Sequence, residues 1–449
     1  MSDELSRNIP NGSRSRKIAS VAVIGAGVMG RGIAAANIEN GIAVTLADID
    51  AQSVRAGIDA ILFDAPNGIS LPPRGPAASS AERGGPGWGG DSAPASIAPI
   101  RACTSDDELL SADLVIETVT ERLSVKQQVL TRLEPLLRRD VLLASNTSGI
   151  SITKIARALT HPERFCGLHF CHPVRHRPLV EVVPGEKTSD QTTAAAVEYV
   201  RSLGKLPIVV KDMPGFLVNR LLTPYLNEAI ELILAGASIE MVEACAQDFG
   251  MPLGPLRQFD EYGIDVAVRT GAMLYAAYPD RIVASELPIA LYKAGRLGRK
   301  TGAGFFTYAT QQPFNSDDAG LIDGDARRLI DERRRTRRWF SPREITLRLF
   351  LPMLLEATRA LDEQVVGDTA AIDAALHGGL GFASPHGGLL RWADALGAET
   401  IVKLLVPFSA LGKRYKPTPM LLRLAAAGRS FYETLSRPLH LAVSKTRAA

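Results

Sequence analysis

Cysteine is scarce in this sequence and is not arranged in pairs. The chain of 449 residues has four cysteines, which are Cys103, Cys166, Cys171 and Cys245. Their spacing matches neither a disulfide framework nor a zinc knuckle, so a disulfide-rich secreted domain is excluded. We therefore expect a protein that works in a reducing compartment, the cytoplasm.

An excess of charge of one sign is also missing. The chain has 51 Lys and Arg residues against 48 Asp and Glu residues, a formal net charge of +3. This balance gives no electrostatic basis for binding nucleic acid or a membrane surface. No apolar run is long enough to span a membrane, and residues 1–4 are polar with no apolar segment behind them, so we expect neither a membrane helix nor a signal peptide.

Apolar residues, by contrast, make up 46% of the chain, enough for sizeable cores in two to four domains. Two stretches lack any apolar pattern. We expect residues 1–16 to be a flexible tail. Residues 66–100 are rich in Pro, Gly, Ser and Ala, and we expect them to be a flexible insertion.

The most informative stretch is a glycine-rich turn that follows an apolar run at residues 21–24. An Ala-rich helical pattern comes directly after it. The turn consists of Gly25, Ala26, Gly27, Val28, Met29 and Gly30. In this strand–turn–helix context, backbone amides bind the pyrophosphate of a dinucleotide. Asp48 ends the next apolar run, where an acid that binds ribose is expected. Asp50 is close and no Arg or Lys is nearby, so the 2′-phosphate of NADP would be repelled. The sequence therefore predicts NAD rather than NADP.

Short apolar strands alternate with helical patterns up to residue 210. We expect strands at 21–24, 42–47, 113–117, 141–145, 165–169, 179–183 and 206–210, and helices at 54–63, 124–137 and 192–203. This alternation predicts an α/β, doubly wound, Rossmann-type domain over residues 17–210.

Strand signals stop after Pro214, and helical spacing takes over. Residues 222–229 (LTPYLNEA) are echoed by 350–357 (FLPMLLEA), and 259–263 (FDEYG) by 393–397 (ADALG). The echo predicts two all-α helical domains related by duplication, at 211–310 and 339–445, joined by a charged linker at 311–338. We expect the copies to pack on each other within one chain, which gives a monomer with an internal pseudo-dimer, or a homodimer.

The linker contains a basic run, made of Arg333, Arg334, Arg335, Arg337 and Arg338. Such a run could meet a nucleotide phosphate. A solvated linker helix is the simpler interpretation.

Polar residues follow two of the predicted strands. Asn146, Thr147 and Ser148 follow the strand at 141–145, where they could contact a substrate or merely cap the next helix. His169 ends the strand at 165–169, and His172 and His176 follow closely.

Three interpretations of these histidines stay open. With a nearby thiol they could form a metal site, although Pro173 and Pro178 break any helix that would align them. His169 could instead be a general base whose imidazole is oriented by Glu181 on the following strand. It could also be a buried histidine that is hydrogen-bonded to the backbone.

Several motifs together resemble the 3-hydroxyacyl-CoA dehydrogenases in order and spacing. They are GAGVMG at 25–30, SNTS at 145–148, HFCHP at 169–173, PLVE at 178–181, DMPGFLVNR at 212–220, MPLGP at 251–255 and GRKTGAG at 298–304. The resemblance covers roughly residues 17–445. LPMLLE at 351–356 and GLGF at 379–382 resemble the second helical copy of the bifunctional fatty-acid oxidation enzymes, whose hydratase half has no counterpart in this sequence.

The resemblance implies NAD-dependent oxidation of (3S)-3-hydroxyacyl-CoA to 3-oxoacyl-CoA, in fatty-acid β-oxidation or a related pathway, with no metal. It makes His169 the catalytic base and Glu181 its partner, while Ser148 and Asn219 position the substrate oxygen and the histidine. Beside Asp48 and the glycine turn, it implies further cofactor contacts by Glu121, Lys126, Ser148 and Lys300.

Two departures from the family pattern leave alternatives open. The family usually has Asn where this chain has His172, and it places a helical hairpin that grips coenzyme A in the region of residues 66–99. A dehydrogenase of a non-CoA 3-hydroxy acid is therefore a second interpretation. A third is a non-catalytic NAD-binding subunit that scaffolds a separate enoyl-CoA hydratase or thiolase of a β-oxidation complex.

Overall fold

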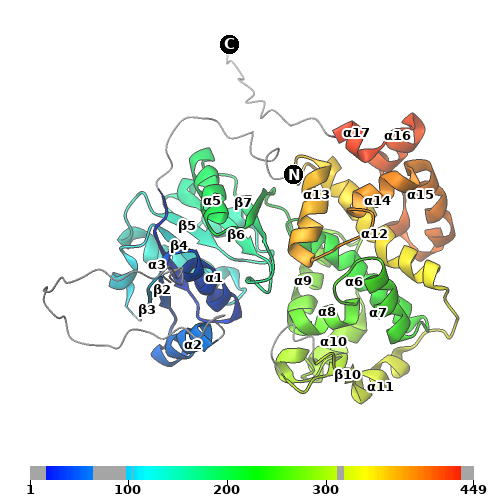
Figure 1. The fold of residues 1–449 in the computed structure, drawn as a ribbon, viewed down its shortest axis with the longest axis horizontal. Helices are drawn as coiled ribbons and strands as arrows, with labels where there is room; N and C mark the ends of the chain where they lie inside the picture. The colour runs from blue at the N-terminus through cyan, green and yellow to red at the C-terminus, as the bar shows by residue number, and fades with distance from the viewer. Residues whose placement is uncertain (1–16, 64–97, 104, 311–317, 436–449) are drawn as a thin grey trace, which may run out of the picture.

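An α/β domain and a helical region make up the molecule (Figure 1). The computed structural model describes residues 17–63, 98–103, 105–310 and 318–435. The predicted tail, most of the predicted insertion and residues 436–445 lie outside these ranges. None of the helices within them combines the length and the apolar character that crossing a membrane requires. All four cysteines are buried and free.

The α/β domain is built on an eight-stranded sheet in the order β3-β2-β1-β4-β5-β6-β7-β8. Its strands are β1 (Ser20–Ile24), β2 (Ala43–Ala47), β3 (Ile100–Cys103), β4 (Leu114–Glu117), β5 (Leu142–Ser145), β6 (Phe165–Phe170), β7 (Leu179–Pro184) and β8 (Leu206–Val209). Strands β1 to β6 are parallel to one another. β7 runs antiparallel to β6, and β8 runs parallel to β7. A short loop joins β6 to β7, as antiparallel neighbours allow.

Helices cover both faces of this sheet, which confirms the doubly wound prediction. One buried core joins the sheet to α1 (Val28–Glu39), α2 (Ala51–Phe63) and α5 (Asp190–Ser202). The core on the other face includes α3 (Leu123–Leu133) and α4 (Ile152–Ala156), and it continues without interruption into the helical region. The sheet domain and the helices therefore share apolar packing.

The order of the strands brings the candidate site residues to one edge of the sheet. β1 lies between β2 and β4, so the strand order reverses beside β1, and doubly wound sheets bind ligands outside the carboxyl ends of the strands at such a point. The glycine turn follows β1, Thr118 follows β4 and Asn146 follows β5. His169, near the end of β6, pairs in register with Glu181 of β7.

The helical region begins directly after the sheet. Its helices are α6 (Val218–Leu234), α7 (Ile239–Asp248), α8 (Pro255–Tyr262), α9 (Ile264–Ala277), α10 (Glu286–Lys293), α11 (Gly324–Arg333), α12 (Pro342–Asp362), α13 (Thr369–Ala375), α14 (Leu389–Leu396), α15 (Ala398–Leu405), α16 (Pro419–Ala427) and α17 (Phe431–Leu435). A π-helical turn spans Leu376–Leu380.

The two echoed segments form matching elements. α6 and α12 each contain an internal proline at the aligned position, Pro224 and Pro352. α8 and α14 each end at a glycine with a positive φ, +94° at Gly263 and +82° at Gly397, and a further helix starts there. These backbone angles favour glycine because other residues rarely adopt them.

Two buried arginines join the copies in a reciprocal way. Arg220 of α6 pairs with Glu356 of α12 (Nε–Oε1 2.5 Å), and Arg348 of α12 pairs with Glu228 of α6 (Nη2–Oε2 2.7 Å). The sequence alignment makes Arg220 equivalent to Arg348 and Glu228 equivalent to Glu356. An exchange of equivalent contacts is what two-fold symmetry produces at an interface. The copies thus pack on each other within the chain, as predicted.

Three details differ from the sequence predictions. β3 starts at Ile100, inside the predicted insertion; the sequence does not predict it because Arg101 and Ala102 are exposed and the strand has no continuous apolar run. The helical region contains a small hairpin, β9 (Phe306–Thr307) and β10 (Leu321–Ile322), although no strand was expected there. The linker helix α11 ends at Arg333, so most of the basic run follows the helix instead of lying in it; there Arg335 pairs with Glu231 of α6 and Arg338 with Glu344 of α12.

Candidate active site

The glycine turn is shaped by steric demands that only glycine meets. Gly25 has a φ of +113°, and its N–H donates to Ala47 O (2.7 Å) on the neighbouring strand. A Cβ on Gly30 would lie 1.8 Å from Gly25 O, so helix α1 can approach the strand only without a side chain there. Around Gly27 the space is open: a Cβ there would meet nothing within 4 Å.

The first turn of α1 has the features of an anion site. No side chain caps it, since Gly27 is the N-cap residue. Its free amides, together with the open space at Gly27, fit the pyrophosphate of a dinucleotide. Asp48 lies across the same turn: Oδ2 accepts from Ala26 N (2.6 Å) and Oδ1 from Ile49 N (2.7 Å). The predicted ribose-binding acid is thus in contact with the turn.

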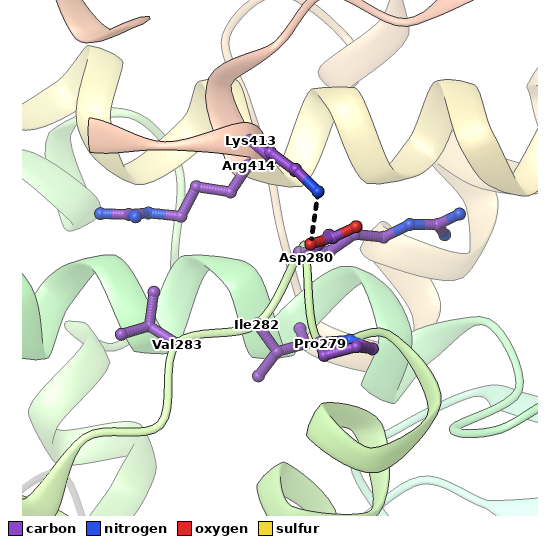
Figure 2. A pocket seen from close by; sticks show the side chains of 7 residues that line it. Pro279, Asp280, Ile282, Val283, Lys413 and Arg414 are labelled. Carbon is purple, nitrogen blue, oxygen red and sulfur yellow. Dashed lines mark hydrogen bonds and ion pairs between the residues drawn. The ribbon is translucent and has the colours of Figure 1, made fainter. Parts of the chain in front are cut away.

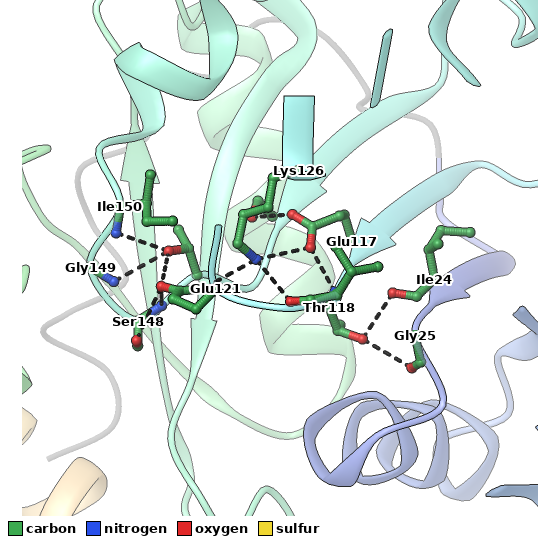
Figure 3. Close-up of polar contacts among 12 residues, drawn as sticks. Ile24, Gly25, Glu117, Thr118, Glu121, Lys126, Ser148, Gly149 and Ile150 are labelled. Carbon is green, nitrogen blue, oxygen red and sulfur yellow. Dashed lines mark hydrogen bonds and ion pairs between the residues drawn. The ribbon is translucent and has the colours of Figure 1, made fainter. Parts of the chain in front are cut away.

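Thr118, which the sequence did not single out, fixes the back of the turn. Its hydroxyl lies 3.0 Å from the carbonyl oxygens of both Ile24 and Gly25 (Figure 3). The hypothetical Cβ atoms of Gly25 and Gly30 would both contact this hydroxyl. Thr118 therefore ties the end of β4 to the glycine turn. The signal in the sequence was its place directly after the strand that ends in Glu117.

Next to Thr118 lies a buried charge network (Figure 3). Lys126 is fully buried, and its ammonium is shared by Glu117 (Nζ–Oε1 2.9 Å) and Glu121 (Nζ–Oε2 3.2 Å). Burial raises the pKa of Glu117, although Lys126 opposes the shift. In Glu121, burial is outweighed by Lys126 and by hydrogen bonds, which lower the pKa. The predicted contact of Lys126 with a cofactor remains a prediction; its ammonium is already paired with both carboxylates.

Glu121 connects this network to Ser148. Its Oε1 accepts from Thr147 Oγ1 (2.5 Å), Ser148 N (3.0 Å) and Ser148 Oγ (3.2 Å). From the other side, Asn219 Nδ2 on α6 donates to Ser148 O (2.9 Å). Asn146 has a structural role instead: its Oδ1 accepts a hydrogen bond from Phe170 N and joins β5 to β6. Three of the predicted site residues, Glu121, Ser148 and Asn219, are therefore in direct contact.

His169 and Glu181 form a buried pair. The distance from His169 Nδ1 to Glu181 Oε2 is 2.5 Å, and His169 is 8% exposed while Glu181 is fully buried. Among the described residues no hydrogen bond to Nε2 of His169 is found, and the ring is not fully enclosed. An imidazole held by a carboxylate at Nδ1 can exchange a proton at Nε2.

The second oxygen of Glu181 is held by backbone. Glu181 Oε1 accepts from Leu217 N (2.8 Å) and Val218 N (3.2 Å), at the start of α6. A helix N-terminus favours negative charge, so it stabilises the carboxylate that orients His169. Asn219 is the next residue of that helix, and its contact with Ser148 joins the pair to the rest of the site.

The other two histidines do not join His169. Burial, together with the charge of Arg177, lowers the pKa of His172 to about 4. His176 lines a cavity of about 220 Å³ beside α1. In the part of the chain that the structure describes, no three His, Cys, Asp or Glu side chains are grouped so as to hold a metal ion.

Lys300 forms its ion pair outside the network of Glu121, Lys126 and Ser148. Its ammonium pairs with Asp265 at the start of α9. That helix reaches the turn after Ser148 near Met273, whose Cε would lie 2.4 Å from a Cβ on Gly149. The two contacts are about 12 Å apart along the helix. The role of Lys300 in cofactor binding stays a prediction.

A cavity of about 340 Å³ lies where the two helical copies meet (Figure 2). It is lined by Pro279, Asp280, Arg281, Ile282, Val283, Lys413 and Arg414. Lys413 Nζ donates to Asp280 Oδ1 (2.9 Å), and Arg281 and Arg414 each donate to a buried glutamate of the opposite copy. The charges of this cavity therefore hold the copies together, and His169 does not line it.

Comparison with known proteins agrees with this geometry. The family model of the 3-hydroxyacyl-CoA dehydrogenase NAD binding domain matches residues 20–213, and the model of the C-terminal domain of the same family matches twice, at 215–308 and 345–436. The chain belongs to the 3-hydroxyacyl-CoA dehydrogenase family. It is an oxidoreductase of this family, whose cofactor is NAD. The two C-terminal matches fall on the two helical copies; the domain boundaries themselves stay proposals.

Individual relatives show the same relationship. The fatty acid oxidation complex subunit alpha of Pseudomonas savastanoi is 36% identical over 423 residues, which cover 93% of this chain and 56% of that protein. The chain thus spans about half the length of the curated relatives it matches. The crystal structure of 3-hydroxybutyryl-CoA dehydrogenase from Escherichia coli K12 matches with a TM-score of 0.74 at 26% identity, over 92% of this chain and 99% of that one.

A shorter dehydrogenase matches as well. The structure of (S)-3-hydroxybutyryl-CoA dehydrogenase PaaH1 from Ralstonia eutropha is 33% identical, with a TM-score of 0.53, and covers 66% of this chain and 100% of that one. All of that protein is therefore matched by only about two thirds of this chain. The E. coli protein, in contrast, matches nearly the full length of both chains.

Proposed function

We propose that the chain catalyses NAD-dependent oxidation of (3S)-3-hydroxyacyl-CoA to 3-oxoacyl-CoA, and the reverse reaction, in fatty-acid oxidation or a related acyl-CoA pathway. The observation that carries the proposal is the His169–Glu181 pair, which lies in the same sheet as the strand that leads into the glycine turn. His169 Nδ1 lies 2.5 Å from Glu181 Oε2, which leaves Nε2 for a substrate. The name of the curated relatives and the substrate in the titles of the solved structures support the substrate class.

The residues divide the chemistry in a simple way. NAD, when bound, supplies the acceptor for the hydride that leaves C3 of the substrate. His169 takes the proton of the 3-hydroxyl group at Nε2 in the same step. Glu181 keeps Nδ1–H in place and balances the positive charge that the imidazole gains; its own charge is held by the Leu217 and Val218 amides.

Ser148 and Asn219 act on geometry in this proposal. The Ser148 hydroxyl stands beside the Glu121 carboxylate, and Asn219 holds the Ser148 backbone from the side of α6. Together they fix the turn between the sheet and the helix on which the 3-oxygen of the substrate would be positioned. Fixed geometry of this kind lowers the entropic cost of the reaction.

The test is NADH oxidation in the presence of acetoacetyl-CoA, with free acetoacetate as the second substrate. We expect turnover of the thioester by the wild type, and a loss of about 10³-fold in kcat for His169→Ala, since a general base contributes about 10² to 10⁴. Turnover of the free acid alone would favour a dehydrogenase of non-CoA acids. NAD binding without turnover of either would favour the non-catalytic subunit.

A further inference from the structure

Phe216 has an unusual backbone for a large buried residue. Its φ is +50°, and only one other non-glycine residue of the described chain, Gln364 (φ +55°), shares the left-handed conformation. Phe216 is fully buried, so no contact with solvent explains its conformation. Residues with a Cβ adopt this conformation at an energetic cost, and they keep it where the surroundings impose it, often at functional sites.

The consequence of this conformation is the direction of the next two peptide groups. Phe216 N donates to Met213 O (2.9 Å), which closes a tight turn. Directly after the turn, the N–H groups of Leu217 and Val218 point at Glu181 Oε1. A right-handed Phe216 would rotate these peptide planes and turn the amides away from the carboxylate. The left-handed backbone of Phe216 therefore orients the amides at the start of α6 toward Glu181.

The side chain of Phe216 reaches the other member of the pair. Its ring centroid lies 5.8 Å from that of the His169 imidazole, with the planes tilted by 54°. This is the range in which aromatic rings attract each other and restrict each other's rotation. One residue therefore contacts His169 through its ring and holds Glu181 through the amides that follow it.

The segment before Phe216 is fastened independently. Asp212 accepts from Ser151 Oγ (2.8 Å), Ile152 N (3.0 Å) and Thr153 N (2.8 Å) at the start of α4. With Asp212 held at one end and the α6 amides at the other, the residues between have little freedom to relax. This explains how the left-handed conformation is maintained.

We propose that Phe216 is a positioning residue that sets the geometry of the His169–Glu181 pair, through its ring and through the turn that it forms. The proposal rests on the proposed dehydrogenase function for its kinetic test only. The second readout is the proton NMR resonance of the hydrogen between His169 Nδ1 and Glu181. A short hydrogen bond shifts such a resonance far downfield, and the measurement needs no turnover. The resonance is assigned by its disappearance in His169→Ala.

The variants are Phe216→Leu, which removes the ring, and Phe216→Gly, which removes the ring and the strain. Gln364→Gly is the matched control, because it relieves the same backbone conformation at an exposed residue for which no hydrogen bond to His169 or Glu181 is found in the described chain. We expect both Phe216 variants to lower kcat with acetoacetyl-CoA by about 10- to 100-fold, with KM for NADH changed less than about twofold. The downfield resonance shifts or broadens in both, and Gln364→Gly behaves as wild type.

Two results would overturn the proposal. One is a wild-type kcat and an unmoved resonance in Phe216→Leu and Phe216→Gly, which would make Phe216 a space-filling residue. The other is a lowered kcat with an unmoved resonance, because Phe216 would then act elsewhere. If Phe216→Gly does not fold, Phe216→Leu decides. If the wild type does not turn over acetoacetyl-CoA, the proposed function fails, and the resonance still tests the role of Phe216.

Discussion

The two helical copies share a framework but differ where the first meets the sheet. Both keep the internal proline, the glycine between two helices and the buried arginine and glutamate of the interface. Both also keep an aspartate that binds two backbone amides: Asp260 accepts from Phe305 and Phe306, and Asp394 from Phe431 and Tyr432. The duplicated features are therefore those that build and join the copies.

The start of the long helix is where the copies diverge. In α12, Ile345 donates to Ser341 O inside the first helical turn. Its counterpart, Leu217, precedes α6, which begins at Val218, and donates to Glu181 instead. Asn219 corresponds to Leu347, which has no polar group to offer. The first copy starts its helix later and gives the released amides to the active site, while the second copy uses them for the helix itself.

The largest effect is expected from breaking the interface that both copies share. Arg348→Met removes two hydrogen bonds to Oε2 of the buried Glu228, which keeps Arg414 and Tyr415 as partners. We expect a loss of about 3 kcal/mol in the free energy of unfolding, because each hydrogen bond to a charged group is worth about 1.5 to 3 kcal/mol. Urea denaturation measures it, and kcat per folded molecule stays unchanged. The matched variant Arg220→Met should lose similar stability. A loss under about 1 kcal/mol in both would contradict the reciprocal interface.

Asn219 and its counterpart Leu347 distinguish the copies, and exchanging them should lower kcat only when the change is made in the first copy. Asn219→Leu removes the bond to Ser148 O, and we expect kcat to fall by about 10- to 100-fold because the turn beside the pair is no longer fixed. Leu347→Asn, the reciprocal change, should leave kcat at the wild-type value. Steady-state kinetics with circular dichroism as a check of folding measures both. Equal effects of the two variants would mean that the copies do not differ in function.

The smallest effect concerns pH. His172 has its pKa lowered to about 4 by burial and by Arg177, so it is neutral in the folded chain above about pH 5. The unfolded chain binds a proton there below about pH 6.5, and stability from this residue is therefore lost as pH falls from 6.5 toward 4. His172→Asn should reduce the loss of unfolding free energy between pH 7 and pH 5.5 by about 1 kcal/mol. The dependence of kcat on pH above pH 6 should be the same in the wild type and in His172→Asn. An inflection above pH 6 that the wild type shows and His172→Asn lacks would contradict this.

Much of the site was predictable because it depends on local patterns. The glycine turn needs only a strand, three glycines and a helix. Glu181 could be paired with His169 because both lie on adjacent strands, and β6 and β7 place them in register. Other features depend on packing between distant segments. The burial of Lys126 and the left-handed backbone of Phe216 follow from neighbours that the sequence does not bring together.

The central claim is that His169 and Glu181 act as one unit, and a double-mutant cycle tests it most directly. kcat for acetoacetyl-CoA reduction is measured for the wild type, His169→Ala, Glu181→Gln and the double variant. If the carboxylate works only through the imidazole, the double variant should be no slower than His169→Ala within about twofold, because residues that act together are not additive. Losses that multiply in the double variant, or a wild-type kcat in Glu181→Gln, would contradict the account.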